Sequence, residues 1–248
     1  MRATSSSSIS RVSPKENSPP PISASVVTGV DRRTASFIRC KCMAPVAIIP
    51  GGTSGLGAAI AALLRGRDIA VVTVSRRETA HVAGDASHED TVKRAIAAAE
   101  KLGEITLLIN CAGVGGFGPV GTYDQENVRR IIDANLTSTI LFCDALFPRF
   151  ARDGGTIVNV LSTAALIAKK DESVYCAAKW GARGYTEVLK AEAKGTKARV
   201  ISVAPGGMQT PFWESPREGF MDPREIAKII VDAIDRPVNV NAIVIERN

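Results

Sequence analysis

Short apolar runs and longer amphipathic stretches alternate along most of this chain. The apolar runs are rich in Val and Ile and have the length of buried strands: 46–50, 69–74, 105–109, 156–160, 199–203 and 242–245. The stretches between them repeat apolar residues at helical spacing: 55–65, 88–102, 124–150, 174–194 and 223–235. This alternation predicts an α/β fold, a doubly wound parallel sheet with helices on both faces. Such a sheet binds its ligands at the carboxyl ends of the strands.

One connection in this pattern is too short to hold a helix. Only ten residues, 75–84, separate the second strand from Asp85, whereas a crossover between parallel strands needs a dozen or more. We therefore expect a sheet that is shortened between strands 2 and 3, with His81-Val82-Ala83 as a short edge strand reached by a loop. Residues 44–248 are expected to form one Rossmann-like domain without internal repeats.

The net charge of +6 suggests a polyanionic partner until the charge is divided along the chain. Residues 1–43 hold seven basic and two acidic side chains, so the remaining 205 residues carry only +1. No basic and aromatic residues are interleaved there, which argues against nucleic-acid binding. No apolar run reaches the 18 residues of a membrane span. The five cysteines have no disulfide or zinc-site spacing, so we expect free thiols and no metal.

The first 43 residues have the composition of a targeting segment. Residues 2–43 include ten Ser, three Thr and four Pro, are poor in acids, and show neither helical nor strand periodicity. Ile38-Arg39-Cys40 resembles a chloroplast stromal cleavage site. We expect a disordered, transit-peptide-like segment and location in the chloroplast stroma. The alternatives are an ordinary disordered tail, or translation from Met43, with a cytoplasmic protein.

A glycine-rich loop, residues 51–57 (GGTSGLG), follows the first predicted strand and opens the first predicted helix. Its glycines allow a tight turn and close approach of the backbone to a ligand, and the helix N-terminus presents unpaired N–H groups to a pyrophosphate. The spacing G-x-x-x-G-x-G differs from the usual G-x-G-x-x-G fingerprint, and the Lys-Ser/Thr pair of a P-loop is absent. The position between strand and helix favours a dinucleotide site over a purely structural turn.

The end of the second predicted strand indicates which dinucleotide binds. It reads Val74-Ser75-Arg76-Arg77, with no acid at its tip. An Asp or Glu there typically holds the free ribose 2′-hydroxyl of NAD, whereas Arg accommodates the 2′-phosphate of NADP. Arg grips a phosphate with several fixed donors. We therefore predict NADP(H) as the cofactor.

Tyr175 and Lys179 lie one helical turn apart at the start of a predicted helix. An adjacent ammonium favours tyrosinate, so we expect the pKa of Tyr175 to lie below its usual value of about 10. Tyr175 would then be a general acid for a carbonyl or a general base for an alcohol. Ser162 stands directly after the strand 156–160, where its hydroxyl can reach the same crevice.

This ordered set of motifs resembles the short-chain dehydrogenase/reductase family of the classical type, as a compact member, over about residues 46–248. The family's motifs correspond to these segments: Pro50-Gly51 to Gly57 for T-G-x-x-x-G-x-G, Asp85 for the acid beside the adenine, Asn110-Cys111-Ala112-Gly113 for N-N-A-G, Asn135, Ser162, Tyr175 and Lys179 for the catalytic set, and Pro205-Gly206 to Thr210 for P-G-x-x-x-T. Pro50 replaces a Thr and removes one backbone N–H, and Cys111 replaces an Asn.

The resemblance implies roles for individual residues. Tyr175 protonates the developing alkoxide, Lys179 lowers the Tyr pKa and binds the nicotinamide ribose, Ser162 donates to the substrate oxygen, and Asn135 holds a water that links Lys179 to solvent. The expected cofactor-binding residues are Gly51, Thr53, Ser54, Gly55, Leu56, Gly57, Ser75, Arg76, Arg77, Asp85, Ala86, Asn110, Cys111, Ala112, Gly113, Tyr175, Lys179, Pro205, Gly206 and Met208. The resemblance also implies a homodimer or homotetramer formed through the helices at 124–150 and 174–194.

The segment 211–221 is short, apolar and contains Pro. Its Phe212, Trp213, Phe220 and Met221 are expected to form a hydrophobic lid over a small or medium-sized apolar carbonyl or alcohol substrate, with core or subunit-contact roles as the alternative. Residues 115–118, after the fourth long predicted strand, are expected to add a flexible wall. The leading hypothesis is an NADPH-dependent oxidoreductase that reduces an aldehyde or ketone to an alcohol. A 3-oxoacyl-carrier-protein reductase is the alternative, with Arg129 and Arg130 as the basic residues available to an acidic carrier. A third hypothesis is a non-catalytic NADP(H)-binding sensor, but the complete catalytic set argues against it.

Overall fold

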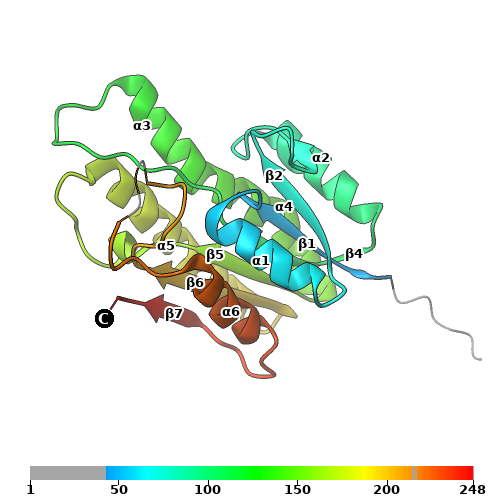
Figure 1. The fold of residues 1–248 in the computed structure, drawn as a ribbon. Helices are drawn as coiled ribbons and strands as arrows, with labels where there is room; N and C mark the ends of the chain where they lie inside the picture. Colours follow the sequence, from blue (N-terminus) through cyan, green and yellow to red (C-terminus); the bar gives the residue numbers. More distant parts are fainter. Residues whose placement is uncertain (1–42, 214, 216, 248) are drawn as a thin grey trace, which may run out of the picture. The chain divides into compact units, whose positions relative to one another are not determined.

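The computed structural model describes residues 43–213, 215 and 217–247. The predicted targeting segment, apart from Met43, lies outside the described residues, so its boundary stays a prediction. Seven parallel strands form one sheet in the order β3-β2-β1-β4-β5-β6-β7 (Figure 1). Their bounds are β1 Pro45–Pro50, β2 Ala70–Ser75, β3 Val82–Ala83, β4 Glu104–Asn110, β5 Gly155–Val160, β6 Ala198–Pro205 and β7 Ala242–Ile245. The predicted doubly wound fold is confirmed.

Helices cover both faces of this sheet. On one face α1 (Gly55–Arg65) and α6 (Pro223–Ile234) lie side by side, as Figure 1 shows. The other face is covered by α2 (Glu89–Glu100), α4 (Ser138–Asp153) and α5 (Ser173–Ala193). Alternate residues of β1 serve the two layers, since Val46 and Ile48 pack under α2 and α4 while Ala47 and Ile49 pack under α1 and α6. Burial on both faces explains why the strands read as continuous apolar runs.

The shortened connection after β2 is confirmed. Residues 76–81 form turns and bends, and Val82 and Ala83 pair in parallel with Val74 and Ser75. His81 lies just outside the strand, with its Nδ1 2.9 Å from the Thr73 hydroxyl. Burial, followed by the charge of Arg65, lowers the pKa of His81. The contact between His81 and Thr73 of β2 therefore holds the short loop that stands in place of a crossover helix.

The predicted helix 124–150 is one continuous helix with a π turn inside it. It consists of α3 (Gln125–Ile132), the π turn η1 (Asp133–Thr137) and α4. The π turn carries Asn135, and such insertions are frequent at functional sites. By length and composition alone, 125–153 is also the single described helix that would suffice to cross a membrane. Its Phe142, Cys143, Leu146 and Phe150 are buried against the sheet, which is the behaviour of a core helix.

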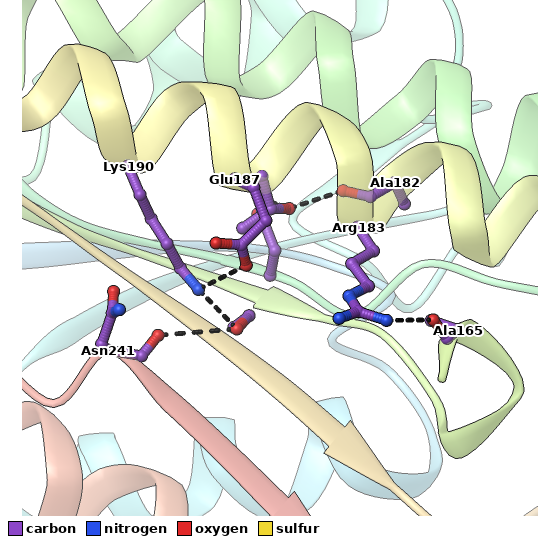
Figure 2. A network of polar contacts seen from close by, with 9 residues as sticks. Ala165, Ala182, Arg183, Glu187, Lys190 and Asn241 are labelled. Carbon is purple, nitrogen blue, oxygen red and sulfur yellow. Dashed lines mark hydrogen bonds and ion pairs between the residues drawn. The ribbon is translucent and has the colours of Figure 1, made fainter. Parts of the chain in front are cut away.

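Polar contacts fasten α5 to the sheet and to the loop after β5 (Figure 2). Lys190 Nζ donates to Glu187 Oε1 and to Ser202 Oγ of β6, both at 2.8 Å. Nearer the start of the helix, an Arg183 N–H donates to the Ala165 carbonyl at 3.1 Å. Ala165 ends η2 (Thr163–Ala165), a short 3₁₀ turn that begins directly after Ser162. The helix that carries Tyr175 and Lys179 is thereby held in place relative to Ser162.

Candidate active site

The glycine loop packs directly on the end of β4. Gly51 has φ +79°, and a Cβ on it would lie 2.6 Å from the backbone of Cys111 and Ala112. A Cβ on Gly57 would lie 2.3 Å from the Gly51 carbonyl oxygen. Pro50 cannot donate, but its carbonyl accepts from the Cys111 N–H at 3.0 Å, while the Gly51 N–H donates to Val74 at 2.8 Å. The neighbouring groups therefore tie the loop to β2 and β4 despite Pro50.

The N-terminus of α1 opens into a cleft along the carboxyl ends of the strands. Within the described ranges, Ser54 makes no side-chain capping bond, and the first turn of α1 holds no acidic residue. Gly55, Leu56 and Gly57 line the cleft. Their N–H groups and the helix dipole suit an anionic group such as a pyrophosphate. This end of the cleft fits the phosphates of a dinucleotide.

Arg76 and Arg77 are exposed at the carboxyl end of β2 and line the same cleft. Thr53 donates to the Ser75 hydroxyl at 3.0 Å, and the Arg77 N–H donates to it at 3.1 Å. Burial raises the pKa of Asp85, but hydrogen bonds from Ser87 and the charges of His88 and Arg76 outweigh it, so the pKa is lowered overall. A fixed carboxylate and two arginines therefore surround this end of the cleft.

The cleft has a volume of 2090 Å³ and brings together nearly all of the residues singled out by sequence. It is lined by Asn135, Ser162, Tyr175 and Lys179, and by every predicted cofactor-binding residue except Asn110. Pro205, Gly206 and Met208 border it from the end of β6 onward. A single cleft therefore joins the phosphate-binding end to the predicted catalytic residues.

Asn110 faces the interior instead. Its Nδ2 donates to Asn159 Oδ1 at 2.8 Å, and Asn159 Nδ2 donates to the Thr186 hydroxyl at 2.9 Å. Asn110, Asn159 and Thr186 are all buried, and they link β4, β5 and α5 in that order. Asn110 thus supports the strand that ends at the cleft, without bordering the cleft itself.

Ser162 and Tyr175 are adjacent at the inner end of the cleft. The Ser162 hydroxyl accepts from the Ala164 N–H at 3.1 Å and lies close to the Tyr175 hydroxyl. Burial raises the pKa of Tyr175, an effect that outweighs the polar influence of Ser162 and is reinforced by the charge of Glu172. The expectation of a lowered Tyr pKa is therefore wrong for this structure, because the desolvation of a phenolate dominates. Tyr175 is a protonated phenol.

Lys179 is buried behind Tyr175, with Nζ 5.9 Å from the centre of the tyrosine ring. The amine donates to the Val160 carbonyl at 3.1 Å. Burial lowers the pKa of Lys179 to about 8, and the nearby Cys111 opposes this only in part. Burial also raises the pKa of the Cys111 thiol to about 12, so Cys111 is neutral at physiological pH. The Lys179 amine is therefore able to gain and lose a proton near neutral pH.

Asn135 lies in the π turn, fully buried, with Nδ2 donating to the carbonyls of Val114 and Ile131 at 2.8 and 2.9 Å. Its Oδ1 has no partner among the residues that the structure describes. Both this oxygen and the Lys179 amine border Gly113, where an added Cβ would lie 2.7 Å from Oδ1 and 3.8 Å from Nζ. The free acceptor and the amine thus face the same small space.

Aromatic side chains pack around the ring of Tyr175. Phe212 and Phe117 have ring centres 5.7 and 6.5 Å from that of Tyr175, and Trp213 stacks on Phe117 at 5.1 Å. Phe220 meets Trp213 edge-on at 5.3 Å. Phe117 follows β4, and the other three follow β6, so two distant loops form one apolar wall. Phe212, Trp213 and Phe220 of the predicted lid line the cleft, and so does Phe117 of the predicted wall. Met221 packs instead against the core under α1 and α6.

Sequence reasoning missed four charged residues at the mouth of the cleft: Lys169, Glu172, Arg217 and Arg247. Lys169 donates to the Thr163 hydroxyl at 3.0 Å. Burial raises the pKa of Glu172, while the charges of Lys169 and Arg217 oppose that shift. No sequence motif marks these residues, because loop conformation alone brings them together. The predicted lid position of Arg217 was the available signal.

Comparison with known proteins agrees with this geometry. Residues 45–219 match the model of the short chain dehydrogenase family. An uncharacterised oxidoreductase from Staphylococcus saprophyticus is 29% identical over 220 residues, which cover 79% of this chain and 93% of that protein. A short-chain dehydrogenase/reductase from Vibrio parahaemolyticus superposes with a TM-score of 0.72 and 31% identity, covering 82% of this chain and 99% of that one.

A second solved structure, a short chain dehydrogenase from Burkholderia cenocepacia J2315 in complex with NADP, is 28% identical with a TM-score of 0.72. The match covers 83% of this chain and 89% of that one. The family match spans the glycine loop, the strand ends and the Tyr175–Lys179 helix alike. By fold, cleft and sequence, this chain belongs to the short-chain dehydrogenase family of oxidoreductases.

Proposed function

We propose that the protein is an NADPH-dependent carbonyl reductase that converts an aldehyde or ketone to an alcohol. The observation that carries the proposal is the adjacency of Ser162, a protonated Tyr175 and a buried Lys179 at the apolar end of the cleft. A raised Tyr175 pKa suits the reductive direction, since the residue must hold a proton to give away.

NADPH, when bound, supplies the hydride for the carbonyl carbon. Ser162 donates a hydrogen bond to the substrate oxygen, a contact that strengthens as negative charge develops there. Tyr175 gives its hydroxyl proton to that oxygen, which completes the alcohol. Lys179 returns a proton to Tyr175, and a water held by Asn135 resupplies Lys179. The free Asn135 Oδ1 next to the amine supports this last assignment.

The preference for NADP(H) over NAD(H) rests on Arg76 and Arg77, which border the cleft with no acid at the strand tip. The NADP complex of the Burkholderia relative supports it. Loss of an arginine–phosphate contact typically weakens binding by about 1.5–3 kcal/mol, or roughly 10- to 100-fold. Arg76→Ser should therefore raise KM for NADPH by that factor and leave KM for NADH nearly unchanged. A wild-type preference for NADH would remove this role from Arg76.

The catalytic assignment is tested by following NADPH oxidation with an aromatic aldehyde, an aliphatic ketone and acetoacetyl-CoA. Tyr175→Phe should lower kcat/KM by about 10²- to 10⁴-fold, the usual contribution of a general acid. Tyr123→Phe is the matched control, because its hydroxyl bonds to Gly116 and Asp171 carbonyls and the residue does not line the cleft. Equal turnover by Tyr175→Phe and wild type would refute the assignment. Preferential use of acetoacetyl-CoA would favour the 3-oxoacyl reductase alternative.

We further propose a homodimer or homotetramer assembled through the long helices. Trp180 and Val188 are about half exposed on α5, so this helix offers apolar side chains for a contact between subunits. Light scattering coupled to gel filtration measures the mass. A monomer at micromolar concentration would contradict this proposal.

The location in the chloroplast stroma remains a proposal based on the composition of residues 1–43. Fusing these residues to a fluorescent protein and following import into isolated chloroplasts tests it. Import with cleavage near Cys40 is expected, and a fluorescent protein that stays outside would favour the cytoplasmic alternative.

A further inference from the structure

The mouth of the cleft combines an apolar wall with positive charge. Five of the twelve aromatic residues in the chain gather there: Phe117, Tyr175, Phe212, Trp213 and Phe220. Phe117 is 46% exposed, and Phe212 and Trp213 are only partly buried, so this wall is not part of the core. An accessible apolar surface beside a reacting group is suited to the body of a substrate.

Two arginines lie against the outer rings of this wall. The Arg217 guanidinium carbon is 4.4 Å from the centre of the Trp213 ring, and that of Arg247 is 4.8 Å from the centre of Phe220. Arg217 also lies 5.9 Å from Phe220, so both guanidinium groups flank one ring. A guanidinium stacked on an aromatic face keeps the N–H donors on its edge for an oxyanion. Both arginines line the cleft.

The balance of charge at this end of the cleft favours an anion. Among the described residues that line it, Lys169, Arg217 and Arg247 are basic and Glu172 is acidic, and burial raises the pKa of Glu172. The neighbouring edge formed by α3 carries both signs and is nearly balanced, with Arg129 and Arg130 against Asp124, Glu126 and Asp133. The excess of positive charge therefore lies beyond the aromatic wall.

From this arrangement we propose that the preferred substrate is a carbonyl compound with a planar, apolar body and an oxyanion at its far end. The carbonyl lies at Ser162 and Tyr175, the body contacts Phe117, Phe212 and Trp213, and a carboxylate or phosphate binds Arg217 and Arg247. This inference rests on the proposed reductase function and names its substrate class.

The test compares four aldehydes of equal reacting geometry: 4-formylbenzoate, its methyl ester, 4-formylphenyl phosphate and benzaldehyde, each with saturating NADPH. We expect KM for at least one anionic aldehyde to be about 10-fold lower than for the ester and benzaldehyde, and the two anionic compounds distinguish carboxylate from phosphate. Arg217→Ala and Arg247→Ala should raise KM for the anionic aldehydes roughly 10-fold or more, and for the ester far less. Arg152→Ala, an exposed arginine paired with Asp153 and outside the cleft, should change neither.

A binding measurement keeps this inference separate from the proposed activity. Terephthalate should quench the fluorescence of Trp213, and dimethyl terephthalate much less. The quenching should disappear in Trp213→Phe and weaken in the Arg217→Ala, Arg247→Ala double variant. Turnover of the neutral aldehydes at equal or lower KM, or binding that does not distinguish acid from ester, overturns the inference. Terephthalate binding without turnover of any carbonyl would uphold the anion site and refute the reductase function.

Discussion

Replacing the buried Lys179 with Met should make the protein more stable while removing its activity. Each pKa unit corresponds to about 1.36 kcal/mol, so a shift of the Lys179 pKa from its ordinary value of 10.5 to about 8 opposes folding by about 3 kcal/mol at pH 7. Met has a similar shape and loses only the bond to the Val160 carbonyl, a contribution of about 1 kcal/mol. The expected net gain is about 2 kcal/mol at pH 7.

The stability of the wild-type protein should change with pH in a direction that the lowered Lys179 pKa determines. Above pH 8 the folded protein releases the Lys179 proton, whereas the unfolded chain retains it up to about pH 10.5, so wild-type stability rises through that window. At pH 9.5 the opposing free energy falls to about 1 kcal/mol, and the advantage of Lys179→Met should vanish.

Urea unfolding followed by circular dichroism at pH 7 and 9.5 measures both free energies of unfolding. Lys190→Met is the matched control, because that buried amine has partners in Glu187 and Ser202 and its loss should not stabilise the protein. A Lys179→Met variant no more stable than wild type at pH 7, or a difference that does not change with pH, would refute the reasoning.

Two further outcomes follow from the same geometry. kcat/KM for carbonyl reduction should decline as the pH rises above about 8, because Lys179 loses its proton while Tyr175 keeps its own. Initial rates from pH 6 to 10 measure this decline, and a flat profile would contradict it. Gly57→Ala should lower the free energy of unfolding by about 1–3 kcal/mol, since its Cβ would lie 2.3 Å from the Gly51 carbonyl oxygen. Gly184→Ala is the control, because a Cβ there meets open space and should cause no such loss. Equal losses in the two variants would contradict the steric argument.

The strands could be predicted to within one or two residues because burial on both faces leaves continuous runs of Val and Ile between polar turns. Even β3, only Val82–Ala83, was expected, since the ten-residue gap excludes a helix. The π turn at Asp133–Thr137 was missed, because five residues are too few to reveal a change of helical period.

Some features of the candidate site could likewise be predicted from the sequence, and others could not. Motif order placed Ser162, Tyr175 and Lys179 in one crevice, because parallel strands end at a common edge. The direction of the Tyr175 pKa shift escaped prediction, because it depends on how fully the packed fold removes water from the ring. The position of Arg217 and Arg247 at the cleft could not be predicted for a related reason, since irregular loops bring these side chains there.

The buried amide chain from Asn110 through Asn159 to Thr186 has a consequence for how the sheet pairs during folding. Apolar strands of Val and Ile tolerate sliding, because one branched side chain replaces another at little cost. A slip of β5 by one residue would instead turn Asn159 to the opposite face of the sheet. The buried Asn110 amide on β4 and the Thr186 hydroxyl on α5 would then each lose their hydrogen bond to Asn159. Each unsatisfied buried group costs about 1–3 kcal/mol, so misaligned pairings lie several kcal/mol above the native one. The same polar contacts that support the cleft therefore select a single alignment of the strands and helix that build it.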